Sequence, residues 1–122
     1  MIIEHGKPIK IEEVIKVSDE FETVSMDDRV LEDIEKSRQR LIEIMRKGEP
    51  VYGINTGYGF FSNKSIDEAD IETLNHNLII SHAVGVGDPL PERIVRAAMF
   101  IRAATLSKGF SGVRAVLIQT LI

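Results

Sequence analysis

The chain has 122 residues, of which 43 % are hydrophobic and 28 % are charged, a composition typical of a folded domain and not of a disordered segment. Its net charge of -4 and isoelectric point near 5.4 argue against a nucleic-acid-binding protein, which would need a basic face. The lack of cysteine excludes disulfides and thiolate chemistry, and the longest apolar run is far below the roughly 18–20 residues of a membrane span.

These properties predict one domain over residues 1–122 in a soluble, cytoplasmic protein. The first residues, Met1 to Lys7, lack the basic start and the apolar core of a signal peptide. The absence of cysteine fits a reducing compartment. No partner among nucleic acids or membranes is expected.

Short strands and one brief helix are predicted within residues 1–25. Gly6 and Pro8 break the first ten residues into a small hairpin. Ile11 to Val17 has the apolar spacing of a brief helix, and Phe21 to Ser25 alternates like a short strand.

A long helix is predicted over about residues 26–47. Ser25 serves as its N-cap, acidic residues follow in the first turn, and Gly48 provides the left-handed residue that ends it. Apolar residues recur at helical spacing: Val30, Leu31, Ile34, Leu41, Ile44 and Met45. The charges between them are best explained as a solvated helix face and not as a binding site.

Three more helices are predicted, over about residues 66–83, 91–108 and 111–122. Ser65 and Ser111 are the expected N-caps of the first and the last. The helix over 91–108 is apolar around almost its whole circumference, so it should be buried on most sides. The sequence then stops while still apolar, and we expect a piece of something larger or a part of an obligate assembly. The predicted fold class is mainly α, with a few short strands near the N-terminus.

The segment from Val51 to Phe60 contains three glycines and two tyrosines within ten residues. This density predicts a mobile or tightly folded loop, and loops held by a rigid scaffold often carry chemistry. Tyr52, at the start of the loop, has the right group for an acid or a base. The alternative is a glycine-rich turn whose tyrosines only pack and donate hydrogen bonds.

The sequence gives little support for a dinucleotide-binding site or a metal site. The Gly57-Tyr58-Gly59 and Gly85-Val86-Gly87 segments both lack the third glycine of a dinucleotide fingerprint. His76 and His82 diverge on a helix, so no metal site is expected. His82 continues an apolar stripe of its helix and, by default, is a core histidine with a structural hydrogen-bonding partner.

Three segments nevertheless occur in a recognisable order and spacing: residues 52–59 (YGINTGYG), 77–87 (NLIISHAVGVG) and 109–114 (GFSGVR). From about Phe21 to the end, the chain resembles the N-terminal part of histidine ammonia-lyases, within the wider aromatic amino acid ammonia-lyase and aminomutase family. The resemblance implies an ammonia-lyase that converts L-histidine to urocanate in a homotetramer with active sites shared between subunits. Tyr58 departs from the family, which often has phenylalanine there.

The resemblance also implies roles for residues of the loop. The family's catalytic tyrosine falls on Tyr52, whose phenolate would remove a proton from the carbon β to the substrate carboxylate. The loop acts as a lid, with Gly53, Gly57 and Gly59 as its flexible points. A weakly acidic C–H group needs a base that is in contact with it and shielded from water, and a closing lid would meet both needs.

The family's substrate-selecting position falls on Ser81 and His82. Ser-His resembles the histidine-specific enzymes, whereas tyrosine and phenylalanine lyases commonly carry His-Leu or Phe-Leu there. A neutral imidazole both donates and accepts, so His82 is expected to pair with the imidazole of the substrate.

The family's electrophile is a methylidene-imidazolone group that forms from an internal Ala-Ser-Gly. These 122 residues contain no Ala-Ser-Gly, and the nearest sequence, Phe110-Ser111-Gly112, belongs to another motif. This chain alone is therefore expected to be inactive. No metal cofactor is expected either. The alternatives are a tyrosine or other aromatic amino acid lyase or an aminomutase of the same family, or a non-catalytic helical assembly module.

Overall fold

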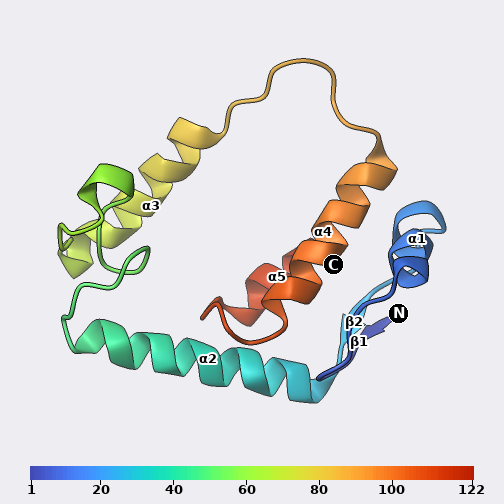
Figure 1. Cartoon of the computed structure of the whole chain (residues 1–122), viewed down its shortest axis with the longest axis horizontal. Helices are drawn as coiled ribbons and strands as arrows, with labels where there is room; N and C mark the ends of the chain where they lie inside the picture. Colours follow the sequence, from blue (N-terminus) through green and yellow to red (C-terminus); the bar gives the residue numbers. More distant parts are fainter. The chain divides into compact units, whose positions relative to one another are not determined.

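The computed structural model describes all 122 residues, except that the side chain of Glu68 is left out. Helices dominate the described chain, and both strands have only two residues, which confirms the mainly α class (Figure 1). The elements in chain order are β1 (Ile2–Ile3), α1 (Ile11–Asp19), β2 (Ser25–Met26), α2 (Asp28–Arg46), the 3-10 helix η1 (Gly59–Phe61), α3 (Glu68–His82), α4 (Glu92–Leu106) and α5 (Ala115–Leu121).

The residues group into two compact units. The terminal unit comprises Met1–Leu41 and Pro89–Ile122, and the central unit comprises Ile42–Asp88. The chain passes from the first to the second within α2. None of the helices in the described part of the chain has the length and apolar composition needed to cross a membrane.

The terminal unit contains a small parallel sheet. β1 pairs with β2 in the register Ile2 to Ser25 and Ile3 to Met26. The predicted hairpin over the first ten residues is therefore wrong, because β1 finds its partner after α1 and not across Gly6 and Pro8. Parallel strands need a long connection, and α1 provides it.

The start of α2 also differs from the prediction. Ser25 does not cap the helix, because its backbone N–H donates to the carbonyl of Met1 within the sheet (3.0 Å). Asp27 takes this role, since its carboxylate accepts a hydrogen bond from the backbone N–H of Arg29 at 2.8 Å. An aspartate suits the position because its charge also favours the positive end of the helix.

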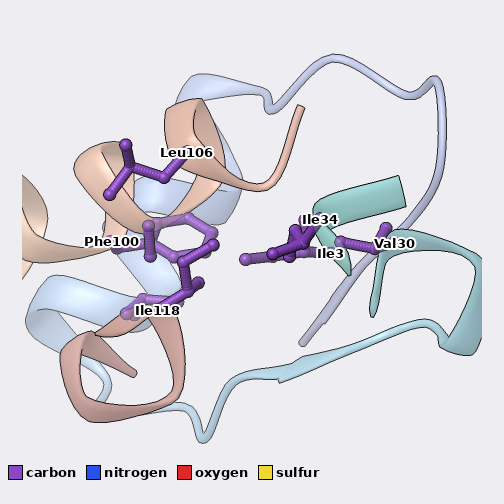
Figure 2. Packing of buried hydrophobic residues seen from close by; sticks show 8 residues of the cluster. Ile3, Val30, Ile34, Phe100, Leu106 and Ile118 are labelled. Carbon is purple, nitrogen blue, oxygen red and sulfur yellow. The ribbon is translucent and has the colours of Figure 1, made fainter. Parts of the chain in front are cut away.

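One hydrophobic core holds the terminal unit together. It draws residues from β1, α1, α2, α4 and α5, and Figure 2 shows its closely packed centre. Ile34 of α2 and Ile118 of α5 are almost fully buried, with 1 % and 0 % of their surfaces exposed. The whole set is Ile3, Val17, Val30, Ile34, Phe100, Ala103, Leu106 and Ile118. Burial of this kind stabilises a domain by roughly 1.5–3 kcal/mol per large side chain.

Arg96 joins α4 to the end of α1. Its Nε donates to the carbonyl oxygen of Val17 at 3.1 Å. Its guanidinium carbon also lies 4.5 Å from the centre of the Phe21 ring. Phe21 has a positive φ of 57°, and the stacking with Arg96 helps to offset that uncommon backbone conformation.

The loop between α4 and α5 packs against α2 through Gly112. The backbone N–H of Gly112 donates to the hydroxyl of Ser37 at 3.1 Å, and its carbonyl accepts from Arg38 at 3.3 Å. A Cβ at Gly112 would lie 3.0 Å from Leu41, and the φ of +61° favours glycine. α5 consequently begins at Ala115, four residues after the predicted start at Ser111.

α4 is less buried than its composition suggests. Phe100, Ala103 and Leu106 face the core, but Ile94 and Ile101 are 44 % and 50 % exposed. An apolar helix face open to water is unfavourable, so this face is suited to contact with further protein.

Candidate functional site

All the site residues predicted from the sequence lie in the central unit, on the loop before α3 and at the end of α3. Asn55 fixes the entrance to this loop. Its Oδ1 accepts the backbone N–H of Val51 at 2.7 Å, and its Nδ2 donates to the carbonyl of Glu49 at 2.9 Å. Because Asn55 is only 8 % exposed, these bonds are sheltered from competing water. The side chain of Asn55 thus holds the backbone next to Tyr52 in one turn.

A short antiparallel bridge closes the loop. Thr56 pairs with Ser65, flanked by hydrogen bonds from Gly57 N–H to the Lys64 carbonyl (3.1 Å) and from Ile66 N–H to the Asn55 carbonyl (3.0 Å). Ser65 is therefore part of the bridge and does not begin α3, which starts at Glu68. Thr56 is only 2 % exposed, so the base of the loop is buried while its tip is open.

The three predicted lid glycines meet different local requirements. Gly53 and Gly59 have positive φ values of 75° and 56°, a conformation that favours glycine. Gly57 has no such φ, but a Cβ there would lie 2.6 Å from Cβ of Phe61. The glycines are thus needed for the folded shape of the loop. Their role in lid movement stays a prediction.

Tyr52 presents its side chain at the surface of the loop, with 63 % of the residue exposed. Its ring meets the ring of Tyr58 edge to face, with 6.4 Å between the centres and 74° between the planes. Such pairs are favourable beyond simple burial, by about 0.5–1.5 kcal/mol. The predicted base is therefore accessible to a substrate and is supported on one side by a second tyrosine.

Tyr58 connects this aromatic pair to α3. Its hydroxyl donates to Oδ1 of Asn75 at 2.8 Å. Asn75 precedes His82 by seven residues, which is close to two helical turns and about 10.5 Å along the axis. Residues seven apart lie on the same helix face. The loop is thus attached to the face of α3 that carries His82.

Ser81 and His82 form a local hydrogen-bonded group at the end of α3. The Ser81 hydroxyl donates to the carbonyl of Leu78 at 2.9 Å. Nδ1 of His82 lies 2.9 Å from the same carbonyl and 2.9 Å from the Ser81 oxygen. A carbonyl only accepts, so the tautomer with its hydrogen on Nδ1 would donate to Leu78 and would leave Nε2 as an acceptor. Both side chains are exposed, so His82 is not the core histidine of the default interpretation.

Of the site residues predicted from the sequence, the structure brings Ser81 and His82 together at the end of α3. Tyr52 instead joins a series with Tyr58 and Asn75, neither of which was predicted as a site residue. None of the hydrogen bonds or aromatic contacts found among the described side chains links Tyr52 to His82. Sequence reasoning missed Asn55 and Asn75. Helical spacing from His82 was the signal that would have found Asn75, whereas the role of Asn55 depends on loop geometry that no periodicity encodes.

A cavity of about 690 Å³ in the terminal unit is separate from these residues. His5 and Asp33 lie on its wall with 2.7 Å between Nδ1 and Oδ2, and Ile101 and Phe110 add apolar surface. None of the predicted site residues lines this cavity.

The residues present do not fit the methylidene-imidazolone group. The chain has no Ala-Ser-Gly from which it could form. The nearest sequence, Phe110-Ser111-Gly112, belongs to the turn that is bonded to Ser37 and Arg38 of α2. Among the described side chains, no group of three or more histidine, aspartate or glutamate residues is arranged to hold a metal ion.

Comparisons with known proteins agree on one family. The family model for aromatic amino acid lyases matches residues 9–122. Histidine ammonia-lyase of Caldanaerobacter subterraneus subsp. tengcongensis is 45 % identical over 121 residues, which cover 99 % of this chain and 24 % of that protein.

Solved structures show the same likeness. The ergothioneine-degrading enzyme ergothionase of Treponema denticola has a TM-score of 0.93 and 35 % identity, over 99 % of this chain and 24 % of that one. Phenylalanine aminomutase of Pantoea agglomerans has a TM-score of 0.93 and 31 % identity, with the same coverage. The chain spans about a quarter of the length of these relatives.

Proposed function

Because the chain belongs to the aromatic amino acid lyase family, we propose that it is the N-terminal part of a histidine ammonia-lyase. In the proposed reaction L-histidine loses ammonia to give urocanate. One C–H bond at carbon β and one C–N bond at carbon α break, and a double bond forms between the two carbons. The observation that carries the proposal is the Ser81-His82 pair, held at the end of α3 with an imidazole nitrogen free to accept.

In this proposal Tyr52 is the base that takes the proton from carbon β. Its ring is exposed on the loop surface, and the backbone beside it is fixed by Asn55. A base in a fixed position next to its substrate avoids much of the entropic cost of a chance encounter. Gly53 and Gly59 would let the loop close over the bound amino acid and exclude water.

His82 would recognise the side chain of the substrate. With its Nδ1 hydrogen directed to Leu78, its Nε2 can accept the N–H of a histidine imidazole. A substrate without an N–H at this place would leave the nitrogen unpaired in a closed pocket, at a cost of about 1–3 kcal/mol. Ser81 would assist by keeping its hydroxyl beside Nδ1.

The methylidene-imidazolone electrophile would have to come from sequence outside these 122 residues. In the complete protein that group would supply an electron-poor centre. We therefore propose that the 122-residue chain alone does not convert histidine, because it contains no Ala-Ser-Gly.

We also propose a homotetramer that works in the cytoplasm. Apolar side chains of the central unit are open to solvent, with Phe60 92 %, Ile79 68 % and Ile80 61 % exposed. Such residues would be covered by the rest of the protein and by other subunits. Light scattering should give four times the mass of one complete polypeptide, and a monomer would contradict the proposal.

The second candidate is an aminomutase or a lyase for tyrosine or another aromatic amino acid. The likeness to a phenylalanine aminomutase supports it. Incubation of the natural-length polypeptide with histidine, tyrosine and phenylalanine, followed by chromatography of the products, separates the two candidates. Urocanate from histidine is the expected product. A β-amino acid would identify an aminomutase, and no product from any of the three would contradict both candidates and favour a non-catalytic assembly module.

A further inference from the structure

We infer that Tyr58 is a positioning residue for Tyr52, acting through its hydrogen bond to Asn75. The inference rests on the proposed function, since it names the device that holds the proposed base. Tyr58 has no proposed contact with the substrate. It would act by fixing the Tyr52 loop to the face of α3 that carries His82.

The rings of Tyr52 and Tyr58 meet edge to face. Tyr52 is 63 % exposed. Its ring makes an aromatic contact with the ring of Tyr58, and 6.4 Å separate the two ring centres. An exposed side chain has few contacts to fix its orientation, so the Tyr58 ring is placed to hold the phenol of Tyr52 in position.

The backbone is tightly folded on both sides of Tyr58. A Cβ at Gly57 would lie 2.9 Å from the Phe61 carbonyl oxygen, so the chain approaches itself closely on one side of Tyr58. On the other side Gly59 has a positive φ, and the carbonyl of Tyr58 accepts the N–H of Phe61 at 3.1 Å. From this tight turn the Tyr58 side chain reaches Asn75 of α3.

The hydroxyl of Tyr58 makes a hydrogen bond of its own. The ring of Tyr58 is half-buried and contacts Tyr52 without its hydroxyl, so a phenylalanine at position 58 would keep that contact. The hydroxyl instead donates to Oδ1 of Asn75 at 2.8 Å, seventeen residues further along the chain. Asn75 and His82 share a face of α3, so this bond ties the proposed base to the helix that carries the proposed recognition group.

The bond lies in an exposed region, where water competes with it. It is therefore suited to break and form again as the loop opens and closes. Its loss would displace the base without removing it, and small displacements of a catalytic group are costly. We expect a loss in kcat of about 3- to 10-fold, the ratio that corresponds to one ordinary net hydrogen bond.

The experiment uses the natural-length polypeptide expressed from its own reading frame. Tyr58→Phe and Asn75→Leu should each lower kcat by that factor, with KM changed less than about twofold and the thermal midpoint unchanged. The double variant should lose no more than either single one, because both remove the same bond. Asn75→Asp keeps an acceptor and should retain activity. His76→Ala, one residue further along α3, is the matched control and should match the parent.

A second measurement does not depend on activity. Amide hydrogen exchange in residues 51–57 should be faster in Tyr58→Phe and in Asn75→Leu than in the parent and in His76→Ala. Parent-like kcat in Tyr58→Phe, when Tyr52→Phe loses most of its turnover, would overturn the inference but leave the proposed function intact. A parent protein without activity would reject the proposed function. Faster exchange in both variants would then still support the Tyr58–Asn75 link, and unchanged exchange would overturn it.

Discussion

Nδ1 of His82 lies 2.9 Å from the carbonyl oxygen of Leu78, one turn earlier in α3, and this contact favours the tautomer in which Nε2 is the free imidazole nitrogen. The free nitrogen, Nε2, is the acceptor that we assign to the substrate imidazole. His82→Leu removes it. We expect kcat/KM for histidine, relative to tyrosine, to fall about 5- to 150-fold, because an unpaired group in a closed site costs about 1–3 kcal/mol.

His82→Gln is the matched variant for this prediction. Its side-chain carbonyl places an acceptor near the position of Nε2, so it should retain more of the preference than His82→Leu. The measurement is the rate of urocanate formation and of the product from tyrosine in the natural-length protein. An unchanged preference in His82→Leu would remove His82 from substrate selection.

Tyr52→Phe should lower kcat by about 10²- to 10⁴-fold while substrate binding persists. The substitution removes only the phenolic oxygen, and a positioned general base contributes about 10²- to 10⁴-fold to a rate. The ring contact with Tyr58 remains, so the thermal midpoint should not change. Steady-state kinetics with histidine measures the turnover, and calorimetry with unreacted substrate measures the binding. Full turnover in this variant would show that the proton goes elsewhere.

Gly57→Ala should destabilise the loop, and Gly85→Ala should not. An added Cβ at Gly57 would lie 2.6 Å from Cβ of Phe61, whereas one at Gly85 would meet no atom within 4 Å. We expect Gly57→Ala to lower the free energy of unfolding by about 1–3 kcal/mol, as overpacking does, and Gly85→Ala to change it by less than about 0.5 kcal/mol. Urea denaturation followed by circular dichroism measures both. Equal stabilities would argue against this loop packing.

Ile118→Ala should be among the most damaging changes in α5. Ile118 is fully buried in the core of the terminal unit, at 0 % exposed, while Val116 of the same helix is 54 % exposed. Removing a buried isoleucine to alanine costs about 2–5 kcal/mol in free energy of unfolding. The control, Val116→Ala, should stay within about 0.5 kcal/mol of the parent, by the same denaturation assay. A small effect at Ile118 would mean that α5 does not close this core.

Much of the helical fold could be predicted from the sequence, because apolar spacing records which helix face is buried. The ends of helices were harder, since several residues compete for each cap. Ser25, Ser65 and Ser111 all look like N-caps, yet Ser25 lies in a strand and Ser65 in a bridge. The pairing of β1 with β2 could not be predicted either. A strand of two residues is too short to show an alternating pattern, and the two strands are separated in the chain by α1.

The candidate site could be predicted where a residue with a reactive side chain lies within a recognisable sequence motif. Tyr52 and His82 stand out by residue type and by their place in recognisable segments. Asn55 does not, because its two hydrogen bonds depend on the turn that they stabilise. The Tyr58–Asn75 bond was equally hidden, since it joins a loop to a helix and neither partner is unusual by itself.

The carbonyl of Leu78 accepts from Ser81 and lies equally close to His82, so the orientation of the imidazole depends on how the last turn of α3 is wound. Fraying of that turn would release the ring to rotate and exchange its two nitrogens. Discrimination between substrates then depends on the stability of the end of α3 as well as on the His82 side chain. Substitutions in the last turn of α3 that never touch the substrate would therefore change which substrates the protein accepts, because they change how stable that turn is.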